Sequence, residues 1–185
     1  MKNFIKLFLT LVLISQITLN KALAQNTKTN SGIRLSVGPE SGIPVGNMHD
    51  RYNWNLGGSV QVDVPISGNP IYLTGLAGFN NFFSKNELTN VPDLQIIPVK
   101  AGLKYFPLNN FYIQGQAGAS FLLDKAKNGY DNSTAFSYAP QVGYQFPVGS
   151  SYIDASVKWE GNTKFKTGGT SNNFIGLRLA YGFGV

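Results

Sequence analysis

The sequence predicts an all-β fold, an eight-stranded antiparallel up-and-down transmembrane β-barrel. About eight segments alternate apolar residues with polar or small ones, the pattern of strands whose two faces meet different surroundings. The junctions alternate in length, with tight turns over 67–70, 107–110 and 147–150 and long polar loops over roughly 40–53, 83–93, 125–134 and 161–172. Short turns at one end and long loops at the other are typical of small membrane barrels.

The first residues are predicted to be a cleaved signal peptide. Lys2 and Lys6 precede an apolar run over 7–14, and Ala22-Leu23-Ala24 forms a small-residue cleavage site before Gln25. The run is too short to span a bilayer as a helix. The predicted organisation is a signal peptide over 1–24, a short lead over 25–31 and a barrel domain over 32–185, exported through the Sec pathway.

The composition excludes several classes of protein. The chain has no cysteine, so it holds no disulfide and no lipid anchor attached through cysteine. Its formal charge of +6 includes three lysines of the signal peptide, and without them twelve Lys and Arg stand against nine Asp and Glu. Such a small and scattered excess does not indicate a nucleic-acid partner.

The first four strands are predicted over 32–39, 54–66, 71–82 and 94–106. The second alternates regularly, with Val60 and Val62 on one face and Asp63 on the other. In the third, Tyr72 and Leu76 break the alternation. The pattern of the third strand is therefore less clean than that of its neighbours.

The last four strands are predicted over 111–124, 135–146, 151–160 and 173–183. The clearest is the first of these, in which Phe111 and Ile113 alternate with Gln114 and Gln116. The remaining three repeat its pattern, so each strand has one apolar face and one polar or small face.

Two prolines lie inside predicted strands. Pro98 and Pro140 cannot donate a ladder hydrogen bond, because proline has no backbone N–H. A closed barrel has no free edge to accommodate them. Each is therefore predicted to mark a bulge or the point where strand pairing ends.

The alternating faces fit either a soluble barrel with an apolar core or a membrane barrel with a polar lumen. Strands long enough to cross a tilted bilayer favour the second, as do small and polar residues at mid-strand on the other face. Aromatic residues also collect at strand ends, as interfacial girdles require: Tyr72, Tyr105, Phe111, Tyr112, Phe146 and Tyr152. A soluble ligand-carrying barrel of the periplasm would instead place Phe121 and Val142 inside.

Three segments carry a resemblance to a known family. They are Gly42-Ile43-Pro44-Val45-Gly46, the strand over 99–105 and the terminal segment over 177–183. With them the chain resembles the outer-membrane β-barrel domains abundant in Bacteroidota, small eight-stranded relatives of the OmpA transmembrane domain within the porin family. The resemblance implies an outer-membrane location, insertion by the barrel-assembly machinery and contact with lipid and lipopolysaccharide. It implies no particular activity.

The charged residues on the polar faces form the one candidate site, a lumen ion-pair network. Unpaired charges are costly in a narrow lumen, so the near balance of signs predicts mutual pairing. The network consists of Arg34, Asp63, Lys100, Lys104, Asp124, Asp154, Lys158, Glu160 and Arg178. It is interpreted as a plugged, structural interior rather than a gated ion pathway, because side chains fill the lumen of eight strands.

Arg178 allows a sharper prediction. Leu177 and Leu179 flank it, and if they face lipid, Arg178 must face the lumen. We expect it within ion-pair reach of Asp154 or Glu160 on the preceding strand, and less favourably of Asp63.

No residues indicate catalysis, a cofactor or a metal. His49, beside Asp50, is the only histidine, and no spacing of Ser and Asp suggests a nucleophile with its base. Lys164 and Lys166 are interpreted as solvated loop charges, with contact to lipopolysaccharide as the alternative. The function predicted is therefore a non-enzymatic, monomeric outer-membrane barrel with a structural or surface-interaction role. The alternatives are a small passive pore and the soluble carrier.

Overall fold

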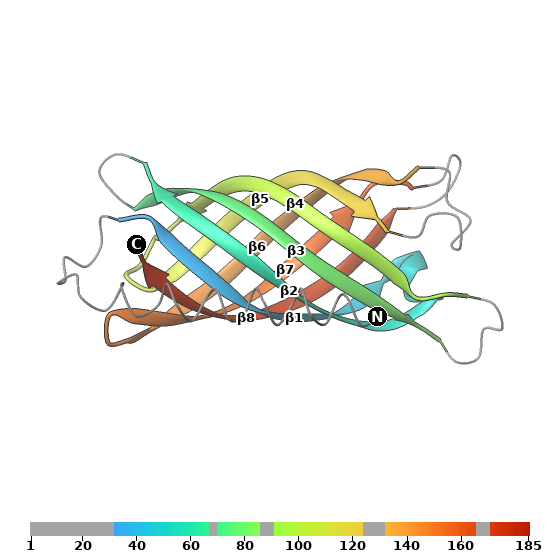
Figure 1. The fold of residues 1–185 in the computed structure, drawn as a ribbon, viewed down its shortest axis with the longest axis horizontal. Helices are drawn as coiled ribbons and strands as arrows, with labels where there is room; N and C mark the ends of the chain where they lie inside the picture. Colours follow the sequence, from blue (N-terminus) through green and yellow to red (C-terminus); the bar gives the residue numbers. More distant parts are fainter. Residues whose placement is uncertain (1–31, 67–69, 86–90, 124–131, 166–170) are drawn as a thin grey trace, which may run out of the picture.

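In a computed structural model, the chain forms a closed barrel in which each strand pairs antiparallel with its sequence neighbours and the last closes on the first. The strands are β1 (Arg34–Val45), β2 (Tyr52–Pro65), β3 (Ile71–Ser84), β4 (Leu94–Tyr105), β5 (Phe111–Leu122), β6 (Thr134–Val148), β7 (Ser151–Asn162) and β8 (Asn172–Gly184). A 3₁₀ turn, η1 (Gly46–Met48), follows β1. The predicted eight-stranded up-and-down barrel is confirmed (Figure 1).

The structure describes residues 32–66, 70–85, 91–123, 132–165 and 171–185. The predicted signal peptide and lead lie outside these ranges. Within them, no helix is long and apolar enough to span a bilayer. The tight turn between β6 and β7 contains Gly149 at φ +60°, a backbone conformation that favours glycine. The C-terminus lies at this tight-turn end of the barrel, and η1 lies at the opposite, loop end (Figure 1).

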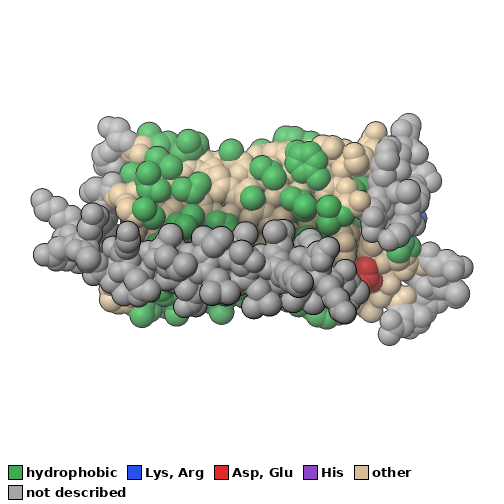
Figure 2. Space-filling view, viewed as in Figure 1, with side chains coloured by type: hydrophobic (Ala, Val, Ile, Leu, Met, Phe, Trp, Pro, Cys, Tyr) green, Lys and Arg blue, Asp and Glu red, His purple; other side chains and the backbone are tan. Residues whose placement is uncertain are grey.

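The barrel wall is apolar outside and polar inside. Along β8, Leu177 and Leu179 are 59% and 56% exposed, whereas Arg178 between them is 2% exposed. Apolar side chains are spread over the outer wall (Figure 2). Phe121 and Val142, which a soluble carrier would bury, are 42% and 47% exposed. This arrangement suits a wall that faces lipid, and it contradicts the soluble-carrier alternative.

The first strand is longer than predicted. It was expected to end at Pro39 and to give way to a loop over 40–53, but β1 runs to Val45 and β2 begins at Tyr52. Pro39 stays paired with Gly58 of β2. In the ladder between β1 and β8, the pair Val37–Tyr181 is followed by the pair Glu40–Arg178, so residues 38 and 39 are skipped and the register does not change. The proline interrupts one ladder and leaves the strand intact, so Glu40 belongs to the barrel wall.

Pro98 and Pro140 show the same behaviour. Pro98 pairs with Ser120 of β5, while the β3–β4 ladder skips it. Pro140 pairs with Gly115 of β5, while the β6–β7 ladder skips it. The register is the same on both sides of each skip, so neither proline marks a bulge or ends its strand. The missing N–H costs bonds to one neighbour only, and the other ladder holds the strand.

The third strand is present as predicted, and its two departures from alternation have one cause. Tyr72 and Leu76 both lie on the lumen face of β3 and are both 3% exposed. Leu76 is paired with Gln61 and Lys100 on the neighbouring strands. An apolar residue in a polar lumen produced the apparent break in the pattern.

Candidate functional site

The lumen contains a central chain of buried charges. Lys100 Nζ lies 2.6 Å from Glu160 Oε2, and Lys158 Nζ lies 3.0 Å from the same oxygen. Lys158 Nζ also lies 2.6 Å from Glu40 Oε2. Lys158 and Glu160 therefore each have two partners of opposite charge. All four side chains are at most 2% exposed. Because the low-dielectric interior penalises any unpaired charge, this alternation of signs offsets the cost of burying these four side chains.

Arg178 continues the chain towards Asp154. Its Nε lies 3.5 Å from Glu40 Oε1, and its Nη1 lies 3.8 Å from Asp154 Oδ1. Nε donates a hydrogen bond to Ser59 Oγ at 2.8 Å, and Ser59 Oγ donates to Glu40 Oε1 at 2.5 Å. Nη2 donates to Ser36 Oγ at 3.1 Å. Arg178 is thus held from three neighbouring strands, β1, β2 and β7.

One of the two ion-pair partners predicted for Arg178 is not found in the structure. Asp154 lies within ion-pair distance, but Glu160 pairs with the two lysines instead. The shorter contact is to Glu40, which the sequence analysis placed in a loop. Glu40 lies an even number of residues from Arg34 and Ser36, so a strand that continued past Pro39 would place it on the same polar face.

A second ion pair lies nearer the tight-turn end. Lys104 Nζ lies 2.5 Å from Asp63 Oδ2, and Gln61 Nε2 donates to Asp63 Oδ1 at 2.7 Å. Lys104 Nζ also lies 4.5 Å from the centroid of the Tyr112 ring, within cation–π range. The Tyr112 hydroxyl donates to Asp154 Oδ1 at 2.8 Å. Tyr112 therefore links this pair to the central chain.

Neutral amides fill the space between these charges. Gln114 Nε2 donates to Gln141 Oε1 at 3.2 Å, and Gln141 Nε2 donates to the Tyr112 hydroxyl at 3.0 Å and to Ser156 Oγ at 2.9 Å. Gln116 Nε2 donates to Thr74 Oγ1 at 3.2 Å. Together with the ion pairs these bonds form a polar network that crosses the lumen, and we call it the central network.

Arg34 lies in an aromatic cluster at the tight-turn end. Tyr72, Tyr112 and Tyr152 were predicted to belong to the interfacial girdle, but their side chains face the lumen, where Tyr72 and Tyr112 are 3% and 0% exposed. The guanidinium carbon of Arg34 lies 4.6 Å, 5.6 Å and 6.0 Å from the ring centroids of Tyr72, Phe106 and Tyr152. Its Nη1 donates to Gln145 Oε1 at 3.1 Å. Of the predicted site residues, Arg34 thus lies among aromatic rings at the end of the lumen.

An apolar cluster fills the loop end of the lumen. It comprises Met48, Tyr52, Phe82, Leu94, Ile96, Leu122, Ala135, Phe165 and Phe174, all buried. The Phe82 ring packs edge-on against Tyr52 at 6.3 Å and against Phe174 at 5.1 Å. Met48 comes from η1 and Phe165 from the segment after β7, so two loops fold inward to complete it. This loop-side cluster was not predicted from the sequence.

The other residues singled out from the sequence lie elsewhere. Asp124 and Lys166 fall outside the described ranges, and His49 and Lys164 are exposed at the loop end. Among the residues that the structure describes, no group of three or more His, Cys, Asp or Glu is placed to hold a metal ion.

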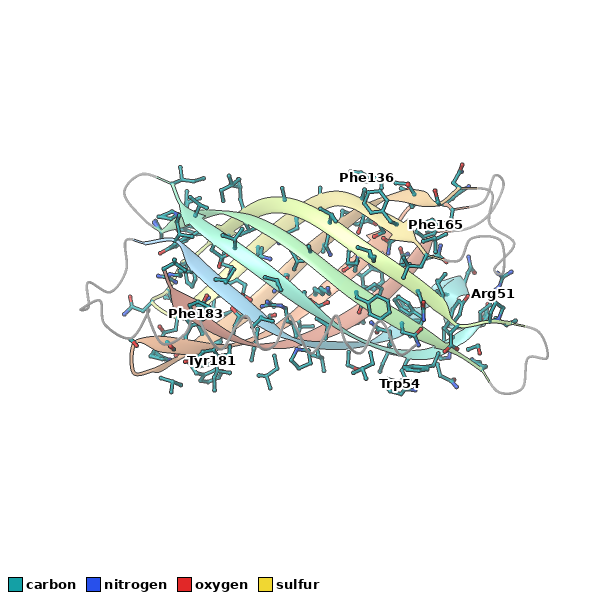
Figure 3. All side chains as sticks on the ribbon, in the orientation of Figure 1. Arg51, Trp54, Phe136, Phe165, Tyr181 and Phe183 are labelled. Atoms are coloured by element: carbon teal, nitrogen blue, oxygen red, sulfur yellow. The ribbon has the colours of Figure 1, made fainter. Side chains whose placement is uncertain are left out.

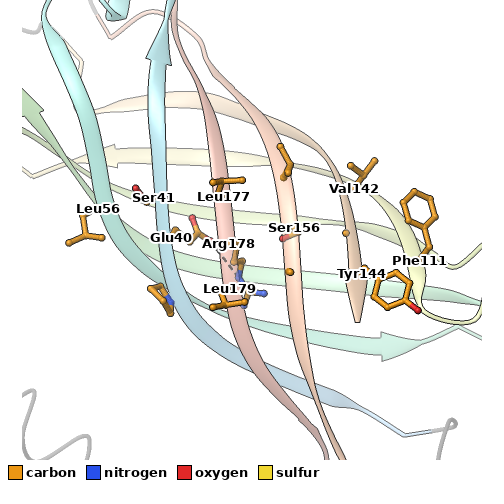
Figure 4. Close-up of a pocket in the computed structure, with 14 residues that line it drawn as sticks. Glu40, Ser41, Leu56, Phe111, Val142, Tyr144, Ser156, Leu177, Arg178 and Leu179 are labelled. Atoms are coloured by element: carbon orange, nitrogen blue, oxygen red, sulfur yellow. Dashed lines mark ion pairs between the residues drawn. The ribbon is translucent and has the colours of Figure 1, made fainter. Parts of the chain in front are cut away.

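Two open hollows of about 570 and 660 Å³ lie along the outer wall. Exposed apolar side chains line the first, among them Val142, Leu177 and Leu179. Figure 4 shows this hollow with the Glu40–Arg178 ion pair beside it. Its apolar lining fits contact with lipid chains.

Comparison with known proteins gives similar folds only. No protein family and no curated protein matches the chain. A designed transmembrane β-barrel is 12% identical, with a TM-score of 0.49 over 84% of this chain and 99% of the other. The outer membrane protein OprG from Pseudomonas aeruginosa is 11% identical, with a TM-score of 0.49 over 84% and 97%. The outer membrane channel DcaP of Acinetobacter baumannii is 20% identical, with a TM-score of 0.37 over 71% and 41%.

Proposed function

We propose that the chain is a non-enzymatic outer-membrane barrel with a closed lumen, and that it serves as a structural or surface-interaction protein. The exposed apolar wall supports insertion in a membrane. Aromatic side chains lie at both ends of that wall, with Trp54 and Phe136 near the loop end and Tyr181 and Phe183 near the tight-turn end (Figure 3). Such girdles are the interfacial anchors of transmembrane barrels.

The main evidence that the lumen is closed is the loop-side cluster. Nine buried apolar or aromatic side chains occupy that end of the lumen, and the Asn55 and Asn80 side chains buried beside them are hydrogen-bonded to each other, so a permeating ion finds few polar partners there. Removing the hydration shell of an ion without such partners is costly. The cluster therefore separates the polar central network from the loop side, and the barrel acts as a scaffold for its loops.

Export, insertion and assembly form part of the same proposal. The chain leaves the cytoplasm through the Sec pathway, is inserted by the barrel-assembly machinery and is surrounded by lipid and lipopolysaccharide. It works as a monomer, and closure of β8 on β1 supports this because no free strand edge is left to pair with a second copy.

The second candidate is a passive pore, which the charged lumen favours. Planar-bilayer recording on the purified protein separates the two. The closed barrel is silent across a range of salt and voltage, whereas steady single-channel steps would establish the pore. A channel altered by Lys100→Ala or Asp154→Ala would show in addition that ions pass through the central network.

Membrane insertion has its own test. The protein is expected in the outer-membrane fraction, and unheated samples are expected to migrate differently from boiled ones on a gel. Recovery as a soluble periplasmic monomer would contradict the proposal.

A further inference from the structure

A stacked aromatic pair lies on the outer wall at the loop end of β2 and β3. The Trp54 and Phe83 ring centroids are 4.5 Å apart with an interplanar angle of 30°. The two residues are cross-strand partners. The register between β2 and β3 shifts between Tyr52 and Trp54, next to this pair. Trp54 is 44% exposed. Aromatic residues at the ends of a membrane-spanning wall typically lie where acyl chains give way to headgroups, and the position of this pair fits that depth.

Two basic residues adjoin this pair. Lys85 N–H donates to the Arg51 carbonyl at 3.0 Å, which extends the β2–β3 pairing one step beyond the strands. Arg51 is exposed and Lys85 is half-buried. Arg51 and Trp54 lie near the same end of the barrel in Figure 3. Both cations thus lie just beyond the loop-side ends of β2 and β3, on the loop side of the stacked rings.

Neither cation is neutralised within the described part of the chain. No carboxylate there lies within ion-pair distance of Arg51 or Lys85. Asp93, on the other side of β3, instead accepts hydrogen bonds from Ser84 N–H at 3.0 Å and from Asn81 Nδ2 at 3.2 Å. The inward-facing cations, by contrast, are held in the polar lumen. Among the described residues, Arg51 and Lys85 are thus the cations left without a carboxylate at this end of β2 and β3.

We propose that Arg51, Lys85, Trp54 and Phe83 form a binding site for a lipid of the loop-side leaflet whose headgroup carries phosphate. The two cations bind the phosphate oxygens, which Arg does with a planar pair of donors and Lys as a point charge. The stacked rings contact the top of the acyl chains beneath. The combination of charge and depth selects a lipid over a soluble anion. This inference rests on the proposed function, because it requires the loop end to lie at a membrane surface.

Trp54 supplies the reporter for a direct test. The chain has two tryptophans, so Trp159→Phe leaves Trp54 as the only one. This variant is inserted into phosphatidylcholine vesicles that contain equal mole fractions of acyl-brominated phosphatidic acid or acyl-brominated phosphatidylcholine. We expect phosphatidic acid to quench Trp54 more strongly. Each cation near a surface favours an anionic headgroup by a factor of about five, so Arg51→Gln and Lys85→Gln each reduce the preference about fivefold.

Lys164→Gln is the matched control, because it removes an exposed loop-end cation on the segment after β7. It is expected to leave the preference intact. Equal quenching by both lipids in the parent protein would overturn the site. An equal loss of preference in Lys164→Gln would also overturn it, since diffuse surface charge would then explain the effect. Absence of quenching by either lipid would contradict membrane insertion itself, so the two failures are distinguishable.

Discussion

At the scale of single residues, Arg178 tests which way the wall faces. Its guanidinium is buried beside Glu40 and Asp154, whereas its neighbour Leu179 is exposed on the outer wall. Arg178→Ala leaves two buried carboxylates short of a partner and is expected to cost about 3–5 kcal/mol. Leu179→Ala is expected to cost clearly less, because lipid replaces the lost contact. Urea unfolding of both variants in detergent measures the difference, and a larger loss for Leu179→Ala would mean that β8 faces the other way.

Glu40 is the residue of the central network that joins its two halves. It accepts from Lys158 and pairs with Arg178, so Glu40→Gln leaves both cations with fewer partners. We expect a loss of several kcal/mol in unfolding free energy. Asp93→Asn makes the same chemical change at an exposed site and is expected to stay within about 1 kcal/mol of the parent protein. Equal unfolding midpoints for the two variants would contradict this role.

The central network shows what the sequence can and cannot predict at this scale. Alternation alone assigned Arg178 and Lys158 to the polar face, because each lies in a regular strand. It could not assign partners, since those depend on which side chains meet across the lumen: Glu40 and Lys158 are 118 residues apart. Glu40 itself was lost because Pro39 was interpreted as the end of a strand.

At the scale of strands, inward glycines allow the narrow barrel to close. A Cβ at Gly118 of β5 would overlap Val99 O and lie 2.7 Å from Lys100 Cα, whereas a Cβ at Gly115 of the same strand would meet nothing within 4 Å. Gly118→Ala therefore forces β4 and β5 apart and is expected to cost about 1–3 kcal/mol. Gly115→Ala is the matched control and is expected to be nearly neutral. Similar unfolding curves for the two variants in urea would show that the wall relaxes without strain.

Strand positions were predictable because alternation persists through each strand, and β2 to β8 begin and end within about two residues of expectation. The exception, β1, has a physical cause. Proline is a sound stop signal where a strand needs both ladders, but Pro39, Pro98 and Pro140 each keep one. A barrel strand has two neighbours, so the loss of one N–H donor does not end it.

At the scale of the whole molecule, the loop-side cluster is the feature that no pattern in the sequence predicted. Phe82 lies far along the sequence from Phe165 and Phe174, and the closed barrel brings the three together. Two of its members, Met48 and Phe165, lie outside the strands, where alternation carries no information. The polarity of the wall was predictable from alternation, and the closure of its end was not.

The polarity of the whole wall can be tested with single cysteines, because the chain has none of its own. Val142 is exposed on the outer face of β6, and its neighbour Gln141 is buried among the hydrogen bonds of the central network. In the membrane-inserted protein, a lipid-soluble maleimide is expected to label Val142→Cys and to leave Gln141→Cys unmodified until the barrel is unfolded. Phe121→Cys on β5 should behave as Val142→Cys does, since both face outward. The reverse pattern would place the apolar face inside, and a soluble barrel with an apolar core would then be the only arrangement left.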